Sequence, residues 1–321
     1  MKEPNFLVRA NCMTYNHAKY IENALDGFCM QQTNFPFICT IVDDASTDGE
    51  QDIIKAYLEK HFNLEDKKIA RFEEYETHSF IYAQNKENKN CYFAVSLLKF
   101  NHYKKVSRRT YIAEWDWVKY HAPCEGDDFW TSPHKLQHQV DFMEKHPGYS
   151  LCFHAHTFLY SDGQKKDHFA YSKDIEDVPI EDMIIGGGGF MATNSMFYVQ
   201  KFKENWPEWA RISPVGDAST MITMAVRGKV GYINEVMSCY RVSTEGSWHQ
   251  RIIKDKKKSK EHYQKTVLSW KKFDEWTDYK YHNIVKKKLL KNKIHFWAKR
   301  YSFIEKAARS VMKCTKRIIK R

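Results

Sequence analysis

Residues 35–62 read FPFICTIVDDASTDGEQDIIKAYLEKHF, and this stretch indicates the fold class. Its first ten residues form an apolar run that ends in Asp43 and Asp44, which is typical of a buried strand with polar chemistry at its carboxyl end. The rest has acids in its first turn and apolar residues at helical spacing, with Ser46 or Thr47 as the expected N-cap. The expected apolar face of this helix consists of Ile53, Ile54, Tyr57 and Leu58.

A similar pair of elements precedes this stretch. Residues 5–13, NFLVRANCM, predict a short strand, and residues 15–31 predict a helix with one apolar face and Asn16 as its N-cap. Strand, helix, strand and helix thus alternate within the first 60 residues. This alternation favours an α/β fold with parallel strands.

The remaining chain gives a coarser pattern. Residues 149–160 predict a strand, and residues 216–242 predict a helix, a turn and a strand. Residues 90–101, NCYFAVSLLKFN, are expected to form a helix. Residues 184–199, which include four consecutive glycines, are expected to form a flexible loop that leads into a strand.

Charge is distributed unevenly along the chain. Residues 250–321 contain 24 basic and 6 acidic residues, whereas the remainder contains 27 basic and 34 acidic residues. We therefore predict two parts, a catalytic or binding domain at 1–249 and a basic helical extension at 250–321. Aromatic and aliphatic residues recur near helical spacing among the basic ones at 295–321, which suits a helix on an anionic membrane surface. A helix that packs on the domain with solvated lysines is the alternative.

Cysteine usage and hydropathy indicate a compartment. The eight cysteines are scattered and include no CxxC pair, so neither a disulfide framework nor a zinc site is expected. The first residues contain no apolar stretch typical of a signal peptide. We expect a cytoplasmic protein, peripheral on the inner face of the membrane if the basic extension binds lipid. No base-reading motif accompanies the basic residues, so no nucleic-acid partner is expected.

Two acidic pairs suggest a cation and ligand site. Asp43 and Asp44 end one predicted strand, and Asp127 and Asp128 follow another in CEGDDFW. Ligands of open α/β sheets bind beyond the carboxyl ends of the strands. Mg²⁺ and Mn²⁺ favour oxygen ligands, and Mg²⁺ is often held by one or two carboxylates together with substrate phosphates. Each pair alone is also compatible with an ordinary loop or cap.

Four blocks of the sequence stand out together. They are CMTYNHAKYIENAL (12–25), FICTIVDDASTDG (37–49), CEGDDFWTSPHKLQHQVDFMEKHP (124–147) and GDASTMITMAVRGKVGYINEVMSCYRV (216–242). In this order and spacing they resemble the inverting GT-A glycosyltransferases of family 2. The resemblance covers about residues 5 to 248 and implies a GT-A (Rossmann-like) mixed sheet flanked by helices. It also implies a nucleotide-sugar donor, most often a UDP-sugar, and Mn²⁺ or Mg²⁺.

The resemblance also implies roles for particular residues. Asp217 matches the catalytic base, which takes a proton from the acceptor hydroxyl, although an aspartate at a helix start also suits an ordinary N-cap. Asp128 matches the metal-binding acid. Arg241 is a candidate clamp for the diphosphate, with a surface salt bridge as the alternative. The other implied donor contacts are Met13, Thr14 and Asn16 in the nucleotide pocket, Asp44 at the base, Asp127 at the ribose and Trp248 over the donor.

These expectations support one hypothesis about the function and leave two alternatives. The chain is expected to transfer a sugar from a UDP-sugar to a hydroxyl of a glycan or lipid-linked acceptor, in bacterial surface-glycan synthesis. A nucleotidyltransferase acting on a sugar phosphate also uses paired aspartates on an α/β sheet. A non-catalytic protein that binds membranes or polyanions through its basic extension is the second rival.

Overall fold

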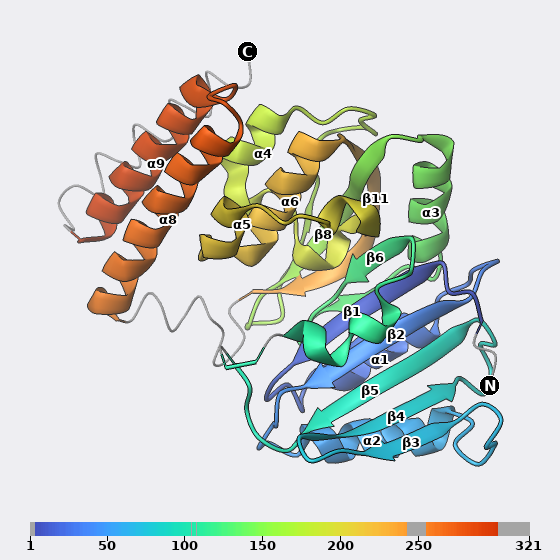
Figure 1. The fold of residues 1–321 in the computed structure, drawn as a ribbon. Coiled ribbons are helices and arrows are strands. Elements are labelled where there is room, and N and C mark those ends of the chain that lie inside the picture. Colours follow the sequence, from blue (N-terminus) through green and yellow to red (C-terminus); the bar gives the residue numbers. More distant parts are fainter. Residues whose placement is uncertain (1–3, 104, 107, 243–254, 301–321) are drawn as a thin grey trace. The chain divides into compact units, whose positions relative to one another are not determined.

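The computed structural model describes residues 4–103, 105–106, 108–242 and 255–300 (Figure 1). The chain divides into two compact units. Unit 1 comprises Met1–Val178, Gly189–Glu204 and Met224–Glu245, and unit 2 comprises Pro179–Gly188, Asn205–Thr223 and Gly246–Arg321. The predicted boundary between residues 249 and 250 falls outside the described residues and stays a prediction.

The strands all belong to unit 1. They are β1 (Val8–Thr14), β2 (Phe37–Asp43), β3 (Arg71–Glu74), β4 (His78–Gln84), β5 (Cys91–Leu98), β6 (Tyr120–Pro123), β7 (Phe129–Trp130), β8 (Tyr149–Leu159), β9 (Lys165–His168), β10 (Phe197–Val199) and β11 (Lys229–Arg241).

Helices occur in both units. The α-helices are α1 (Ile21–Cys29), α2 (Glu50–His61), α3 (Lys135–Lys145), α4 (Ile180–Gly186), α5 (Glu208–Ile212), α6 (Gly216–Arg227), α8 (Lys256–Trp276) and α9 (His282–Arg300). Short 3-10 helices are η1 (Arg108–Tyr111), η2 (Ala113–Trp115), η3 (Gly187–Gly189), η4 (Thr193–Ser195) and η5 (Gln200–Lys203).

Unit 1 is built on one mixed sheet. The strand order is β3-β4-β5-β2-β1-β6-β10-β8-β11-β7, and β9 pairs with β8. The four strands β5, β2, β1 and β6 are parallel, and antiparallel pairs flank them on both sides. The predicted α/β class with a mixed sheet flanked by helices is therefore confirmed.

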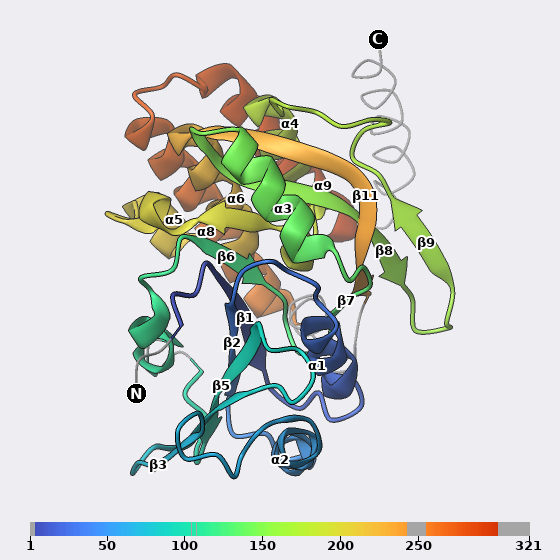
Figure 2. The same cartoon turned by 90° about the vertical axis from the view of Figure 1, so that its right-hand side faces the viewer.

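The faces of the central strands are covered differently (Figure 2). On one face, α1, α2 and α3 bury their apolar sides in the main core, as the helical spacing of Ile21, Leu25 and Phe28 predicts. On the other face, Trp115 and Val118 pack with strand residues of β2, β4 and β5. Burial on both faces explains why β2 is buried along its whole length and reads as a continuous apolar run.

The prediction of a helix at residues 90–101 is wrong. Cys91–Leu98 forms β5, which lies between β2 and β4 in the sheet. Seven of its eight residues are buried, so the sequence shows no period-two alternation. An apolar run that is buried on both faces cannot be distinguished from a buried helix by periodicity alone.

The predicted helix caps are also wrong. Helix α1 begins at Ile21, and Asn16 lies in the preceding loop with φ 58°. Helix α2 begins at Glu50 after Gly49, whose φ of 90° favours glycine. The side chains of Asn16 and Ser46 instead bond the two loops to each other, because the parallel strands bring the loops together.

Unit 2 is helical in its described part. It contains α4, α5, α8, α9 and the first part of α6. Trp209 of α5 is buried and packs against Trp270 and Phe273 of α8. Residues 180–189 form α4 and η3, so the loop predicted across the four glycines is largely helical. None of the described helices is long and apolar enough to cross a membrane.

Candidate active site

Polar residues of unit 1 gather where the parallel strands end. Strands β1, β2 and β6 run in the same direction, so their carboxyl ends lie at one edge of the sheet. Thr14 ends β1 and Asp43 ends β2, and Asp127 and Asp128 follow β6 before the short strand β7. The tertiary structure thus brings together two acidic pairs that are more than 80 positions apart in the sequence.

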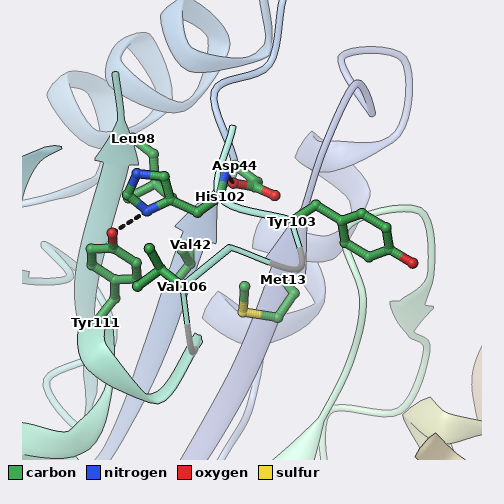
Figure 3. A pocket seen from close by; sticks show the side chains of 8 residues that line it. All are labelled: Met13, Val42, Asp44, Leu98, His102, Tyr103, Val106 and Tyr111. Atoms are coloured by element: carbon green, nitrogen blue, oxygen red, sulfur yellow. Dashed lines mark hydrogen bonds between the residues drawn. The ribbon is translucent and has the colours of Figure 1, made fainter. Parts of the chain in front are cut away.

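A small pocket lies beside Asp44 (Figure 3). The Asp44 Oδ1 atom accepts a hydrogen bond of 2.6 Å from the backbone N–H of His102, and the Asp44 N–H donates to the Thr14 carbonyl at 3.0 Å. The lining combines apolar side chains with the Asp44 carboxylate and with polar groups of His102 and two tyrosines, and such a mixed lining suits a flat heterocycle that offers an N–H group. The lining residues are Met13, Val42, Asp44, Leu98, His102, Tyr103, Val106 and Tyr111.

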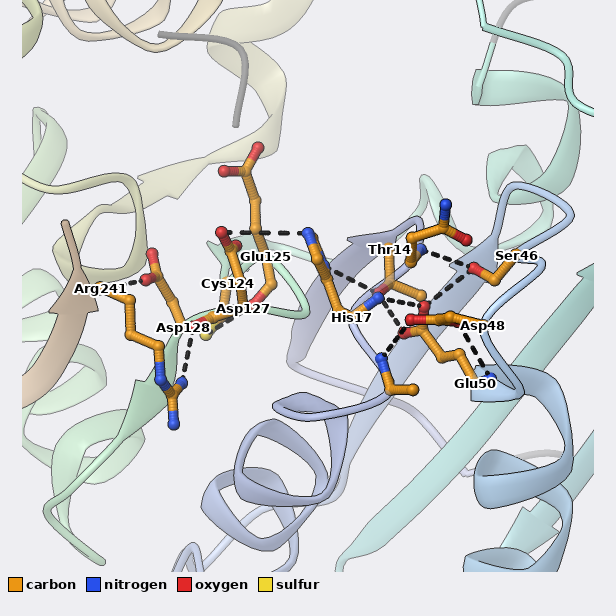
Figure 4. Close-up of polar contacts among 12 residues, drawn as sticks. Thr14, His17, Ser46, Asp48, Glu50, Cys124, Glu125, Asp127, Asp128 and Arg241 are labelled. Carbon is orange, nitrogen blue, oxygen red and sulfur yellow. Dashed lines mark hydrogen bonds and ion pairs between the residues drawn. The ribbon is translucent and has the colours of Figure 1, made fainter. Parts of the chain in front are cut away.

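A buried glutamate joins the loops after β1 and β2 (Figure 4). Glu50 is fully buried and accepts hydrogen bonds from the Thr14 hydroxyl, the His17 N–H and the Ser46 hydroxyl. Burial raises the pKa of Glu50, and these hydrogen bonds oppose the rise. Sequence reasoning missed Glu50, because its partners are 33 and 36 positions away except for Ser46.

Asn16 belongs to the same pair of loops. Its Oδ1 atom accepts a 2.8 Å hydrogen bond from the Thr47 N–H, and its own N–H donates to the Ser46 hydroxyl at 2.9 Å. Thr14 contacts Glu50, and its hydroxyl oxygen lies 3.1 Å from His17 Nδ1. The side chains of Thr14 and Asn16 therefore shape this edge of the sheet through bonds within the protein.

Gly126 allows the acidic loop after β6 to approach β1. A Cβ atom at Gly126 would lie 2.1 Å from the Thr14 hydroxyl oxygen, closer than any real contact. The next residue, Asp127, then places its Oδ2 atom 3.9 Å from His17 Nε2. Glycine is thus required because two loops meet here without space for a side chain.

Gly126→Ala should lower the free energy of unfolding by about 1–3 kcal/mol, because the added methyl group forces the two loops apart. Urea unfolding would measure the change. Gly189→Ala is the matched control, since a Cβ atom there has no neighbour within 4 Å; its effect should stay below about 1 kcal/mol. Equal free energies of unfolding for the two variants would show that the loops after β1 and β6 can move apart without loss of stability.

Asp128 is the carboxylate best suited to a cation. It is 1% exposed, and its Oδ1 atom accepts a 2.8 Å hydrogen bond from the Arg241 N–H. Its buried Oδ2 atom has no hydrogen-bond partner among the residues that the structure describes. Burial and the neighbouring Asp127 charge raise the pKa of Asp128 well above its usual value, while the Arg241 N–H opposes the rise. A divalent cation fits here, because it would satisfy this oxygen and offset the repulsion between the carboxylates.

Arg241 is held by contacts within unit 1. Its guanidinium donates to the Asp127 carbonyl and to Asn23 Oδ1, both at 2.6 Å. The guanidinium carbon also lies 4.8 Å from the ring centre of Tyr20 and 4.6 Å from that of Phe129. Arg241 therefore fixes the acidic loop from two sides, and its predicted contact with a diphosphate stays a prediction. Trp248 lies outside the described residues.

Asp217 belongs to unit 2, in the first turn of α6. The Asp217 Oδ1 atom accepts a 2.7 Å hydrogen bond from the Ala218 N–H. Burial raises the pKa of the Asp217 carboxyl, and this hydrogen bond acts in the opposite direction. Gly188 adjoins the carboxylate, since a Cβ atom on Gly188 would lie 3.7 Å and 3.8 Å from its two oxygens. Asp217 is thus a half-buried carboxylate with a raised pKa, which suits a proton acceptor.

The two histidines of β8 are core residues. His154 and His156 are both buried, and burial lowers the pKa of each, that of His156 to about 4. No group of three or more His, Cys, Asp or Glu side chains in the described parts of the chain has the arrangement of a metal site. A cation at Asp128 would therefore also need oxygen ligands from a molecule bound in the site.

Comparison with known proteins relates one part of the chain to a protein family. Residues 13–91 match the family model described as Glycosyl transferase family 2. Uncharacterized proteins of Mycobacterium bovis and Mycobacterium tuberculosis are 32% identical over 238 residues, which is 74% of this chain and 59% of theirs. The chain thus spans less than two thirds of the length of these relatives.

Solved structures share the fold at low sequence identity. TarS of S. aureus in complex with UDP-GlcNAc has a TM-score of 0.55 at 15% identity, over 83% of this chain and 66% of that one. Mannosyltransferase PcManGT from Pyrobaculum calidifontis, in complex with GDP-Man and Mn²⁺, has a TM-score of 0.51 at 12% identity, over 100% and 82%. These likenesses concern the fold, whereas the family model matches the sequence from the end of β1 to the start of β5. Residues 13–91 therefore have the sequence of glycosyltransferase family 2, and the chain has a GT-A-type mixed α/β fold.

Proposed function

We propose that the chain is a metal-dependent, inverting glycosyltransferase that uses a nucleotide-sugar, most simply a UDP-sugar. The observation that carries this proposal is the buried Asp128 carboxylate with an unsatisfied oxygen, at the sheet edge that also holds the Asp44 pocket. The complexes of TarS with UDP-GlcNAc and of PcManGT with GDP-Man and Mn²⁺ support the same class of ligand.

In this proposal the donor lies along the strand ends of unit 1. Met13 and Asp44 receive the base, with the Asp44 carboxylate accepting from a ring N–H, and Thr14 and Asn16 hold the loop around it. Asp127 faces the ribose, and Asp128 holds Mn²⁺ or Mg²⁺. The cation, when bound, neutralises charge on the diphosphate leaving group.

Asp217 is the proposed general base. Its carboxylate accepts the proton of an acceptor hydroxyl as the oxygen attacks the anomeric carbon opposite the leaving diphosphate, so that one displacement inverts the configuration. A raised pKa makes the carboxylate a stronger base than an exposed aspartate, and burial is the cause of the rise. The acceptor in this proposal is a hydroxyl of a glycan or lipid-linked glycan of a bacterial surface.

A ligand screen on the wild-type protein tests the proposal. Melting temperature is measured with UDP, GDP, UDP-GlcNAc, UDP-glucose and GDP-mannose, each with Mn²⁺ and with EDTA. A ligand present at 100 times its Kd adds about 2.7 kcal/mol to the free energy of unfolding. A rise with one nucleotide that requires Mn²⁺ supports the proposal. No rise with any of them in the presence of Mn²⁺ excludes the donor site.

Most of the predicted membrane-binding helix at 295–321 lies outside the described residues, and α9, which contains its first residues, supports a membrane position for the enzyme. It contains seven Lys and Arg residues and no Asp or Glu. Leu290 and Trp297 are 59% and 41% exposed and share one stripe with the exposed Lys286 and Lys293. Val285 of the same helix is buried, so α9 both packs within unit 2 and exposes an apolar stripe between lysines. Such a stripe suits the surface of a membrane with anionic lipids.

Replacing Lys286, Lys287 and Lys293 by glutamine should weaken binding to phosphatidylglycerol vesicles by about two orders of magnitude. Each basic residue near an anionic surface contributes about 1 kcal/mol. Vesicle co-sedimentation measures the partition, with phosphatidylcholine vesicles as the uncharged reference. The control replaces the exposed lysines of unit 1, Lys60, Lys67 and Lys68, by glutamine. Equal binding by the two triple variants would exclude α9 as the contact.

A further inference from the structure

Lys288 is a buried lysine whose ammonium group donates a hydrogen bond to a backbone carbonyl oxygen. It lies in α9 and is 8% exposed. Its ammonium group donates to the Ile185 carbonyl at 3.1 Å and lies 5.9 Å from the ring centre of Trp270. Burial lowers the pKa of Lys288 to about 8, and the charge of Lys291 adds to the shift. Burying an ammonium group costs free energy unless polar groups compensate it. The groups around Lys288 therefore indicate what this lysine does in the fold.

The Ile185 carbonyl belongs to the last turn of α4. Two ammonium groups of α9 donate to this one oxygen, since Lys291 Nζ also lies 3.0 Å from it. An ammonium group at a helix C-terminus donates hydrogen bonds to the carbonyls that lack a partner within the helix, and its positive charge interacts favourably with the helix dipole. The C-terminal extension therefore fixes the end of α4, within unit 2.

The residues after α4 join Lys288 to Asp217. Gly187 has φ 61°, and a Cβ atom there would lie 2.6 Å from Lys288 Nζ. Gly188 follows, and a Cβ atom on it would lie 3.2 Å from Val215 Cγ1 and 3.7 Å from Asp217 Oδ1. Two consecutive glycines thus form a turn with the ammonium group of Lys288 against the first and the carboxylate of Asp217 against the second.

We propose that Lys288 is a positioning residue, which holds the Gly187–Gly188 turn against Asp217 and so keeps the carboxylate desolvated and aimed at the acceptor hydroxyl. This inference rests on the proposed role of Asp217 as general base. It makes the C-terminal extension part of the acceptor side of the reaction, in addition to any contact with a membrane. The surroundings of Asp217 are consistent with this role, because burial raises the pKa of its carboxyl while the backbone hydrogen bonds it accepts act in the opposite direction.

The test compares Lys288→Met with Lys291→Met in the full chain. Both lysines donate to Ile185, but of the two only Lys288 lies within 4 Å of the position that a Cβ atom on Gly187 would take. We measure the release of nucleoside diphosphate from UDP-GlcNAc, UDP-glucose and GDP-mannose with Mn²⁺ and with water as acceptor, across pH. Lys288→Met should lower kcat about tenfold, a part of what a general base contributes, with KM for the donor unchanged. It should also move the acid limb of the pH profile to lower pH, because water then reaches Asp217.

Further variants separate this role from general stability. Lys288→Arg should recover part of kcat, since it keeps a cationic donor, and Lys291→Met should stay within about twofold of wild type. Gly188→Ala should shift the acid limb as well, because its methyl group displaces the turn from Val215 and Asp217. The melting-temperature rise with nucleotide and Mn²⁺ reports that unit 1 is intact in each variant.

Two results overturn the inference in different ways. Suppose that wild type releases diphosphate and Asp217→Asn does not. An unchanged kcat and pH profile in Lys288→Met then rejects the role of Lys288, and the proposed role of Asp217 stands. An equal loss in Lys291→Met rejects the role of Lys288 too, because capping of α4 would then be sufficient. If wild type releases no diphosphate from any of the donors, the proposed function fails, and the inference fails with it.

Discussion

Asp217→Asn should lower kcat by about a thousandfold, within the range that general acid–base catalysis contributes. Asparagine has nearly the shape of aspartate, and its Oδ1 atom can still accept the Ala218 N–H. It cannot take a proton at neutral pH, so the acceptor oxygen would have to attack while still protonated. Donor binding should not change, because the predicted donor contacts lie in unit 1. The assay is diphosphate release under saturating donor and Mn²⁺.

The pH dependence gives this prediction a second measurement. Asp217 must be ionised to act as a base, so activity should be lost as the pH falls through its pKa. Burial raises that pKa, which places the acid limb of wild type above the ordinary range of aspartate. The same rise means that ionised Asp217 destabilises the fold as the pH increases through this window. Asp217→Asn should therefore be at least as stable as wild type at neutral pH.

The control for Asp217→Asn is Glu208→Gln. Glu208 is an exposed acid in the first turn of α5, in the same unit. Its loss should leave kcat within about twofold of wild type, in line with the small effects of most surface substitutions. A kcat of Asp217→Asn equal to that of Glu208→Gln would show that Asp217 is an ordinary residue of the helix start.

Asp128→Asn should abolish the metal-dependent part of donor binding. The asparagine Oδ1 atom can keep the hydrogen bond from the Arg241 N–H, but an amide nitrogen replaces the oxygen that has no partner among the described residues. A cation then loses a charged ligand, and Kd for the nucleotide with Mn²⁺ should rise at least a hundredfold, about 2.7 kcal/mol. Calorimetric titration of the nucleotide selected by the ligand screen, with and without Mn²⁺, measures this change.

The melting temperature of Asp128→Asn shows whether the substitution removes only the cation site or also disturbs the fold. In EDTA, Asp128→Asn should melt no lower than wild type, because it removes a buried charge next to Asp127. Asp141→Asn, an exposed acid in α3, should change neither binding nor melting temperature. Unchanged Mn²⁺-dependent binding in Asp128→Asn would place the cation elsewhere or exclude it.

Local patterns in the sequence determined the start of the fold. Ile21, Leu25 and Phe28 have the spacing of one helix face, and the apolar run before Asp43 is long enough for a buried strand. These signals depend on neighbours a few positions away, so they survive without knowledge of the tertiary structure. They also placed both acidic pairs near strand ends, which was sufficient to predict the sheet edge that carries the site.

The tertiary structure decided what the local signals could not. The run at Cys91–Leu98 became β5 because it lies between two strands, and its sequence alone is equally compatible with a helix. Glu50 and Gly126 acquired their contacts from partners in loops far away in the sequence, and the proposed role of Lys288 depends on a glycine 101 positions earlier. Strand order and helix packing create such contacts, and no periodicity within a short window encodes them. The sequence thus determined the first strands and helices and the chemistry available, while the tertiary structure decided the state of the buried run at Cys91–Leu98 and which side chains meet.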